Sequence, residues 1–209
     1  MLEDSNKMFL VLEGIDGCGK STQAKLLAAE LERRGRQVLH LHEPGGTPLG
    51  ETIRELILNS GSKIGIHSRA EALLYSAARA ELVHDVLRPA LAEGRWVVCE
   101  RYYYSTLAYQ GYGLGEDTGL LHSLSAYATE AVKPKRVVLL DLDPGEALKR
   151  AGRSLDRIES RGTGYMQKVR EGYFLLSRRE PERFRIVKAG GSEEEVQRAV
   201  LGALEDVLP

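Results

Sequence analysis

Short apolar runs alternate with longer amphipathic stretches along the chain, which is the pattern of a sheet covered by helices. The runs are brief and are bounded by glycine or polar turn residues, so they indicate buried strands. They are FLVLE (9–13), QVLHL (37–41), WVVCE (96–100), RVVLLDL (136–142) and RFRIV (183–187). Strands that alternate with helices predict an α/β fold, with a doubly wound parallel sheet of five strands and helices on both faces.

The stretches between the runs repeat apolar residues at helical spacing. From residue 20 to residue 34, Leu26, Leu27 and Leu31 would share one buried face, and Gly35 would stop the helix. Ser68 and Glu71 have the spacing of a capping box, so they predict the start of a long helix. Pro89 would kink or end that helix.

Composition is ordinary for a soluble globular protein, at 43% hydrophobic and 28% charged residues in 209. The net charge of −1 creates no global field toward nucleic acid or an anionic membrane, so neither is an expected partner. The apolar run at residues 8–12 is too short for a membrane span. Two cysteines make no disulfide framework, and we expect a single cytoplasmic domain with reduced thiols.

The segment between the first strand and the first helix has the pattern G-x-x-x-x-G-K-S, which is typical of a phosphate-binding loop. Its backbone amides would hold phosphate oxygens, the lysine would reach the outer phosphates of ATP and the serine hydroxyl would bind Mg²⁺. A glycine-rich turn with a chance lysine is the alternative. The expected ATP-binding residues are Gly14, Ile15, Asp16, Gly17, Cys18, Gly19, Lys20, Ser21 and Thr22.

Asp16 is unexpected inside a loop that binds anions. Two like charges about 4 Å apart repel by ~4 kcal/mol at an effective dielectric constant near 20. The carboxylate therefore needs either a partner away from the phosphates or a purely structural role in an Asp-Gly turn.

Further candidate residues follow the other predicted strands, at the edge where an α/β sheet binds its ligands. Glu43 follows the second strand, in EPGGT, with Arg54 beyond it. Glu100 and Arg101 follow the third strand, where they would contact Mg²⁺ and a transferred phosphate or form a structural ion pair. Residues that would line a base or sugar pocket, or simply pack, are Thr106, Tyr109, Gln110 and the helical pair Tyr75 and Arg79.

Arginines are concentrated late in the chain. Arg150, Arg153, Arg157 and Arg161 are spaced for one helix face, and Gly152 would interrupt that helix. Such a run is usually a solvated surface. In a phosphoryl-transfer enzyme it would instead be a lid that stabilises transition-state charge.

Taken together, five segments resemble thymidylate kinase, in the bacterial-type branch with arginines in the lid. They are EGIDGCGKST, EPGGTPLG, LLYSAARAEL, ERYYYSTLAYQG and LDRIES. The resemblance implies one P-loop nucleoside monophosphate kinase domain over residues 1–209, with a lid at about 149–162. It implies transfer of the ATP γ-phosphate to dTMP with Mg²⁺, and a homodimer.

The resemblance also implies roles for single residues. Lys20, Arg101, Arg153 and Arg157 would be catalytic, and Ser21 and Glu100 would bind Mg²⁺. On the acceptor side, Asp16 would accept a hydrogen bond from the 3′-hydroxyl, and Tyr75 would stack on thymine. Arg79 and Thr106 would bond the base, Tyr109 would lie beside the sugar, and Gln110 would line the pocket. Arg54 and Arg101 would hold the acceptor phosphate, with Glu43 near it and the metal.

The sequence departs from the family pattern at two positions, and two other functions are alternatives to this prediction. Where the family has Arg-Glu-Pro and Asp-Arg, this chain has His42-Glu43 and Glu100-Arg101. A deoxynucleoside kinase would use Glu43 as a base. A GTPase-type switch would need an N-K-x-D motif, and the sequence has no Asn-Lys pair after the phosphate-binding loop.

Overall fold

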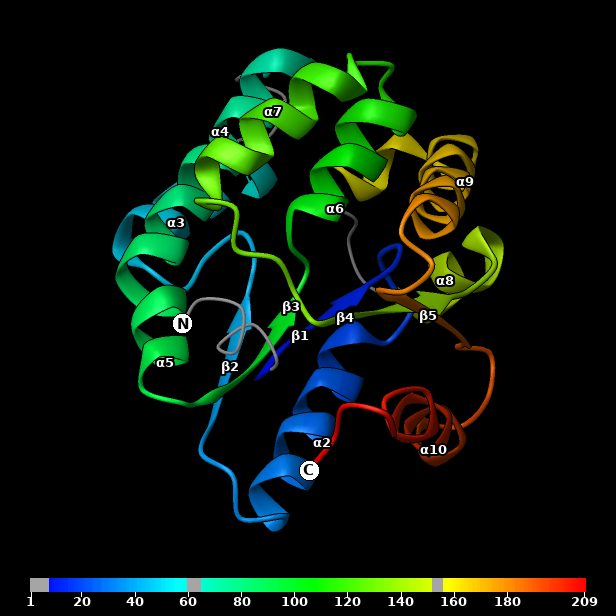
Figure 1. The fold of residues 1–209 in the computed structure, drawn as a ribbon. Helices are drawn as coiled ribbons and strands as arrows, with labels where there is room; N and C mark the ends of the chain where they lie inside the picture. Colours follow the sequence, from blue (N-terminus) through cyan, green and yellow to red (C-terminus); the bar gives the residue numbers. More distant parts are fainter. Residues whose placement is uncertain (1–7, 60–64, 152–155) are drawn as a thin grey trace.

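The computed structural model describes residues 8–59, 65–151 and 156–209, which form a three-layer α/β domain around one parallel sheet (Figure 1). The strand order is β2-β3-β1-β4-β5, so the first strand is central and the chain winds outward in both directions. The predicted five-stranded, doubly wound sheet is thus confirmed. The strands are β1 (Phe9–Glu13), β2 (Val38–His42), β3 (Trp96–Glu100), β4 (Arg136–Asp141) and β5 (Phe184–Lys188).

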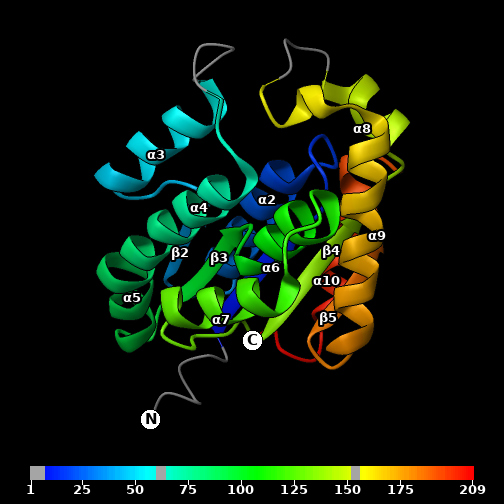
Figure 2. The ribbon, with the colours of Figure 1, turned by 90° about the horizontal axis from the view of Figure 1, so that it is seen from above.

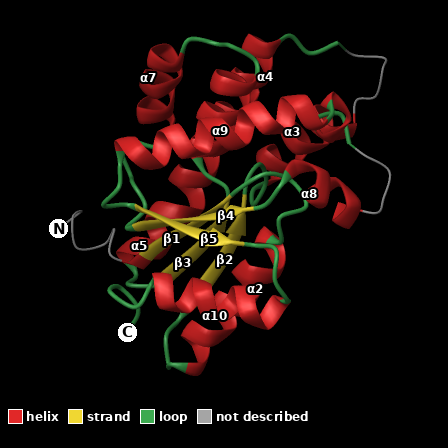
Figure 3. Cartoon of the chain, turned by 90° about the vertical axis from the view of Figure 1, so that its right-hand side faces the viewer, coloured by secondary structure: helices red, strands yellow, loops and turns green. Residues whose placement is uncertain are grey.

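Helices cover both faces of the sheet. Figure 3 shows α2 and α10 on one face and α4, α7 and α9 on the other, and Figure 2 shows the same molecule from above. The helical segments are α2 (Lys20–Arg33), α3 (Pro48–Asn59), α4 (Ser68–Leu82), η3 (Val83–Leu87), α5 (Arg88–Ala92), α6 (Tyr103–Thr106), η4 (Leu107–Gly113), α7 (Thr118–Ala128), α8 (Pro144–Ala151), η5 (Glu159–Arg161), α9 (Thr163–Arg179) and α10 (Glu193–Ala203).

The central strands are buried on both faces, which explains their continuous apolar sequences. Every residue of β1 is buried, and β1 pairs with both β3 and β4. Leu12 lies opposite Glu100, and Glu13 lies opposite Leu139. This register brings the residues that follow β1 and β3 to the same edge of the sheet.

Two local predictions are wrong. Leu26 is 38% exposed, whereas Leu27 and Leu31, the other two residues of the predicted face, are buried. The capping residue of α4 is His67, whose ring nitrogen accepts a hydrogen bond from the backbone N–H of Arg69. Ser68 instead donates to Glu116.

Pro89 does not end its helix. The chain continues from α4 through the π-helical segment η3 into α5, and Pro89 lies in the first turn of α5. Proline lacks a backbone N–H, and a π-turn just before it changes the hydrogen-bond register of the helix, so the helix tolerates the missing donor.

Candidate active site

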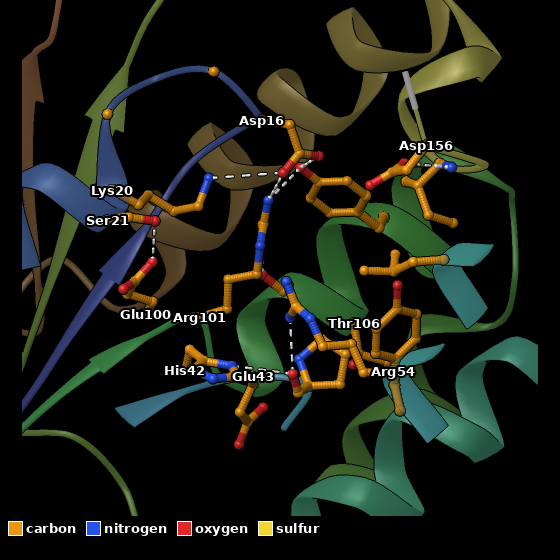
Figure 4. Close-up of a pocket in the computed structure, with 18 of the residues that line it drawn as sticks. Asp16, Lys20, Ser21, His42, Glu43, Arg54, Glu100, Arg101, Thr106 and Asp156 are labelled. Carbon is orange, nitrogen blue, oxygen red and sulfur yellow. Dashed lines mark hydrogen bonds and ion pairs between the residues drawn. The ribbon is translucent and has the colours of Figure 1, made fainter. Parts of the chain in front are cut away.

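One cavity of about 970 Å³ opens at the carboxyl edge of the sheet, where β1, β2 and β3 end (Figure 4). It brings together most of the residues that the sequence predicts for ATP and the acceptor. The predicted residues that line it are Asp16, Gly17, Gly19, Lys20, Ser21, Thr22, Glu43, Arg54, Tyr75, Glu100, Arg101, Thr106, Tyr109 and Gln110.

The loop between β1 and α2 forms one end of this cavity. Gly14 has φ of +143°, and a Cβ there would lie 2.6 Å from the carbonyl oxygen of Leu140 on the neighbouring strand. Gly19 is the N-cap of α2, which has no side-chain cap. Unpaired amides at a helix start attract an anion. Two of the expected loop residues, Ile15 and Cys18, are buried among the core residues. Their side chains therefore support the loop from within the core.

Lys20 is 8% exposed and lies at the first position of α2. Its Nζ donates to the carbonyl oxygens of Ile15 at 2.8 Å and Gly14 at 3.2 Å, and lies 3.9 Å from Oδ1 of Asp16. The ammonium is thus held over the loop, within the cavity wall.

Asp16 directs its carboxylate toward Arg101, as Figure 4 shows, and also contacts Tyr109. Nη2 of Arg101 donates to Oδ1, and the Tyr109 hydroxyl donates to Oδ2 at 2.9 Å. Burial alone would raise the pKa of Asp16, but Arg101 and Lys20, with the hydrogen bond from Tyr109, lower it to about 2. The carboxylate is therefore charged and paired, which removes the conflict with the anion-binding loop.

Arg101 lies just after β3 in a left-handed conformation, with φ of +67°. Its Nη2 also donates to the hydroxyl of Tyr109 at 3.1 Å. Its Nη1 donates to the carbonyl of Gly14 and to Oγ of Ser105, each at 3.1 Å. Asp16 and the other anionic neighbours hold the pKa of Arg101 well above its usual value despite burial, so it is a fixed positive charge in the cavity.

Ser21 and Glu100, the expected Mg²⁺ ligands, are in contact. Oγ of Ser21 donates to Oε2 of Glu100 at 2.5 Å, and Nε2 of His40 lies 2.9 Å from Oε1. Burial would raise the pKa of Glu100, but these two hydrogen bonds hold it below the usual value. A charged carboxylate beside a hydroxyl fits a hard cation that takes its other ligands from phosphates and water. The described residues contain no cluster of three His, Cys, Asp or Glu side chains that could hold a metal ion.

Glu43 and Arg79 form a buried ion pair beneath the acceptor side. Nε of Arg79 donates to Oε2 of Glu43 at 2.7 Å, and its Nη1 donates to Oγ1 of Thr106 at 3.1 Å. Oε1 of Glu43 is buried and has no hydrogen-bond partner among the described residues. Burial raises the pKa of Glu43 to about 7, against the opposing effect of Arg79.

The remaining acceptor-side candidates come from three elements. Arg54 of α3 donates to the carbonyl of Pro44 at 2.9 Å. Tyr75 of α4 is half-buried in the cavity wall. Gln110 of η4 donates from Nε2 to Oε1 of Glu71 at 2.7 Å. These contacts place all three side chains around the same cavity, with Glu71 behind Gln110.

The described lid arginines do not share a helix face, so that prediction is wrong. Arg150 lies on α8, whereas Arg157 and Arg161 lie beyond its end and both bind Glu71, at 2.5 and 2.6 Å. Nε of Arg157 also donates to the carbonyl of Ile57 at 2.7 Å. Arg153 and Gly152 lie outside the described residues.

Sequence reasoning missed several residues of the cavity. His40 and Asp156 line it, and Glu71 holds two arginines and Gln110 from behind. His40 and His42 are two residues apart in β2, so their side chains lie on the same side of the strand. No sequence pattern indicates that Glu71 lies behind the cavity, because its spacing from Ser68 is that of a helix capping box.

Among the described residues, no helix is both long and apolar enough to cross a membrane. Comparisons with known proteins cover nearly the whole chain. Thymidylate kinase of Pelotomaculum thermopropionicum is 46% identical over 96% of this chain and 94% of its own length. That of Deinococcus radiodurans is 43% identical over 97% and 98%.

The structural comparison agrees with the sequence relatives. The crystal structure of thymidylate kinase from Ehrlichia chaffeensis has a TM-score of 0.75 and 32% identity, and the match covers 94% of this chain and 98% of that one. The family model for thymidylate kinase matches residues 12–200. The chain belongs to the thymidylate kinase family.

Proposed function

We propose that this protein transfers the γ-phosphate of ATP to dTMP, giving dTDP and ADP for dTTP synthesis. The observation that carries the proposal is one cavity with a phosphate-binding loop at one end and Asp16, Arg101 and Tyr109 clustered beside it. Family membership supports dTMP as the acceptor.

The donor side of the cavity binds ATP. Residues 14–22 surround its phosphates, with backbone amides of the loop and of α2 as donors. Ser21 and Glu100 would hold Mg²⁺, which would neutralise charge on the donor phosphates when bound. Lys20 lies close enough to the loop to contact the transferring phosphoryl group.

The acceptor side binds dTMP. Asp16 accepts from the 3′-hydroxyl, and Tyr109, beside Asp16, lies against the sugar. Tyr75 stacks on thymine, while Thr106, Gln110 and Arg79 form the base end of the pocket. Arg54 and Arg101 hold the acceptor phosphate, with Glu43 nearby. These roles follow the family resemblance, and they are supported by the cavity that all of these side chains except Arg79 line.

The reaction needs no general base. The second pKa of a phosphate monoester is about 6, so the acceptor is largely dianionic at neutral pH. Its oxygen attacks the γ-phosphorus as the bond to the β–γ bridging oxygen breaks, and ADP leaves with that electron pair. Lys20, Arg101, Arg153 and Arg157 stabilise the spreading negative charge.

The deoxynucleoside kinase alternative is not favoured, and acceptor assays test the difference. ADP release is measured with dTMP and with thymidine at equal concentration. Turnover of dTMP with little turnover of thymidine is expected, since two arginines suit a phosphate better than a hydroxyl. Faster turnover of thymidine would reject the proposal. Turnover of no small nucleotide would favour the switch class.

We further propose a cytoplasmic homodimer with a lid at about residues 149–162. Among the described residues, five of the nine exposed large apolar side chains lie on α4 and on the two helices packed against it, α3 and α7. They are Leu49, Leu56, Leu73, Leu120 and Tyr127. Such a cluster is typical of a protein interface.

A further inference from the structure

Glu13, the last residue of β1, is a buried carboxylate that the proposed mechanism does not use. It is 0% exposed and is not among the described residues that line the cavity. Three donors surround it: the backbone N–H of Tyr102 at 2.8 Å, Oγ of Ser105 at 2.7 Å and the hydroxyl of Tyr173 at 2.7 Å. A buried charge is costly, so this arrangement calls for a reason.

Two of these donors also contact Arg101. Nη1 of Arg101 lies 3.1 Å from Oγ of Ser105 and 3.5 Å from the hydroxyl of Tyr173. A hydroxyl has one proton and two lone pairs. When Ser105 and Tyr173 donate their protons to Glu13, their lone pairs face the guanidinium. The carboxylate therefore orients both hydroxyls so that they accept hydrogen bonds from the guanidinium of Arg101.

Glu13 also fixes the backbone next to Arg101. Its Oε1 binds the N–H of Tyr102, and the N–H of Arg101 itself donates to Leu12 at 2.9 Å. Arg101 has φ of +67°, a conformation that a residue with a Cβ adopts only when its surroundings enforce it. Contacts on both sides of the residue supply that enforcement.

The guanidinium is thereby divided between two environments. Nη1 faces Gly14, Ser105 and Tyr173, whereas Nη2 faces Asp16 and Tyr109 in the cavity (Figure 4). Burial raises the pKa of Glu13 above its usual value, although Arg101 and the three donors act in the opposite direction.

We propose that Glu13 is a positioning residue for Arg101: through the hydroxyls of Ser105 and Tyr173 it holds Nη1, so that Nη2 faces the acceptor phosphate. The role rests on the proposed function, in which Arg101 binds that phosphate. Glu13 itself touches neither nucleotide.

Glu13→Gln tests the role with little change of shape. An amide nitrogen cannot accept a hydrogen bond, so in Glu13→Gln either the two hydroxyls or the N–H of Tyr102 lose their acceptor, and one of the two supports of Arg101 is lost. We expect kcat/KM for dTMP to fall by about tenfold or more, with KM for ATP changed by less than about threefold. Glu30→Gln, which removes a carboxylate paired with Arg33 outside the cavity, is the matched control and should stay near wild type.

A double-mutant cycle separates positioning from simple destabilisation. If Glu13 acts through Arg101, Glu13→Gln in an Arg101→Ala background should cost less than about threefold in kcat/KM. Equal losses in both backgrounds would overturn the proposal, as would wild-type kcat/KM in Glu13→Gln alone. Should Glu13→Gln fail to fold, Tyr173→Phe replaces it in the same cycle with the same criteria.

Wild-type turnover of dTMP is measured first. Its absence would refute the proposed function and leave the role of Glu13 to be decided separately. The cycle is then run on whichever nucleotide acceptor the wild type phosphorylates. Coupling between Glu13 and Arg101 supports the role on that acceptor, and lack of coupling refutes it.

Discussion

Asp16 and Glu43 are carboxylates of one cavity whose pKa values move in opposite directions. Asp16 faces Arg101, Lys20 and a tyrosine hydroxyl, which lower its pKa to about 2. Glu43 has one arginine and one buried oxygen without a partner among the described residues, and burial raises its pKa to about 7. Number and placement of donors thus decide which carboxylate stays charged at neutral pH.

Lys20→Ala should remove nearly all turnover and leave the fold intact. Among the described residues, its ammonium contacts loop carbonyls, a thiol and Asp16 and no apolar core side chain, so packing does not depend on it. A lost charge at the transferring phosphoryl group costs about 10²–10³ in kcat. Turnover and thermal unfolding are measured together, with the exposed α9 residue changed in Lys168→Ala as the control. Near-normal turnover in folded Lys20→Ala would reject the P-loop kinase mechanism.

Glu43→Gln should flatten part of the pH dependence of stability. Below pH 4.5 Glu43 is protonated in both the folded and unfolded chains, and its contribution is fully present. As pH rises toward 7, the unfolded chain loses the proton first, so the folded state loses stability. The Tm of the glutamine variant, relative to that of wild type, should therefore rise between pH 5 and pH 8. A constant difference across this range would contradict the raised pKa.

At the scale of elements, Glu71 joins three segments that are distant in sequence. It lies on α4, is wholly buried, and binds Gln110 of η4 together with Arg157 and Arg161. Both arginines share this anchor, but Arg157 also contacts α3 through the carbonyl of Ile57. The same carboxylate thus supports the acceptor pocket and the later part of the proposed lid.

Arg157→Ala and Arg161→Ala form a matched pair that tests the lid. Each variant removes one arginine from Glu71, but only Arg157 is proposed to reach the phosphates. We expect kcat to fall by about 10²-fold for Arg157→Ala, with a small change in KM for dTMP, and by less than about tenfold for Arg161→Ala. Arg153→Ala should behave like Arg157→Ala. Similar kcat values for wild type, Arg153→Ala and Arg157→Ala would assign these arginines to a solvated surface.

Ser192→Ala should destabilise the protein without affecting catalysis. Ser192 and Glu195 form a complete capping box at the start of α10. Loss of such a cap costs about 1 kcal/mol, and about 2–4 °C in Tm for a domain of this size. Ser123→Ala, inside α7, serves as the control because its hydroxyl bonds only within that helix. An unchanged Tm would show that the cap adds nothing to stability.

At the scale of the whole molecule, exposed apolar residues are unevenly distributed. Leu73 of α4, Leu120 of α7 and Tyr127 of α7 are 56%, 68% and 85% exposed, and the two helices pack against each other. Leu49 and Leu56 lie on α3, which also packs against α4, and the other exposed large apolar residues among those described are dispersed over α2, α8, α9 and β5. This face is the natural candidate for the proposed dimer contact.

Leu73→Glu should convert a dimer to a monomer, because a buried unpaired charge at an interface is costly. Light scattering coupled to size exclusion measures the mass. Leu148→Glu on α8 introduces the same charge at a residue of similar exposure away from this face, and should leave the mass unchanged. A monomeric wild type would reject the homodimer, and a dimeric Leu73→Glu would place its contact elsewhere.

Much of this architecture is predictable from sequence, because the interiors of strands such as β1 and β3 are apolar and residues that line the cavity lie at or just after their ends. The phosphate-binding loop is equally predictable from its glycines and Lys20. The contacts between distant side chains cannot be predicted in this way. Glu71 and Arg157 are far apart in the chain, and nothing local signals their contact. Pro89 indicates a break, yet the π-helical register that accommodates it depends on packing.

Both cysteines of the chain are out of reach of solvent, which makes the protein convenient for site-specific labelling. Cys18 and Cys99 are each 1% exposed, and burial raises the pKa of the Cys99 thiol well above its usual value. Maleimide dyes and spin labels need an accessible thiolate. A cysteine introduced at Leu148, which is 44% exposed on α8, would therefore be the single reactive thiol, and a probe there would report movement of α8 during turnover without prior removal of the native cysteines.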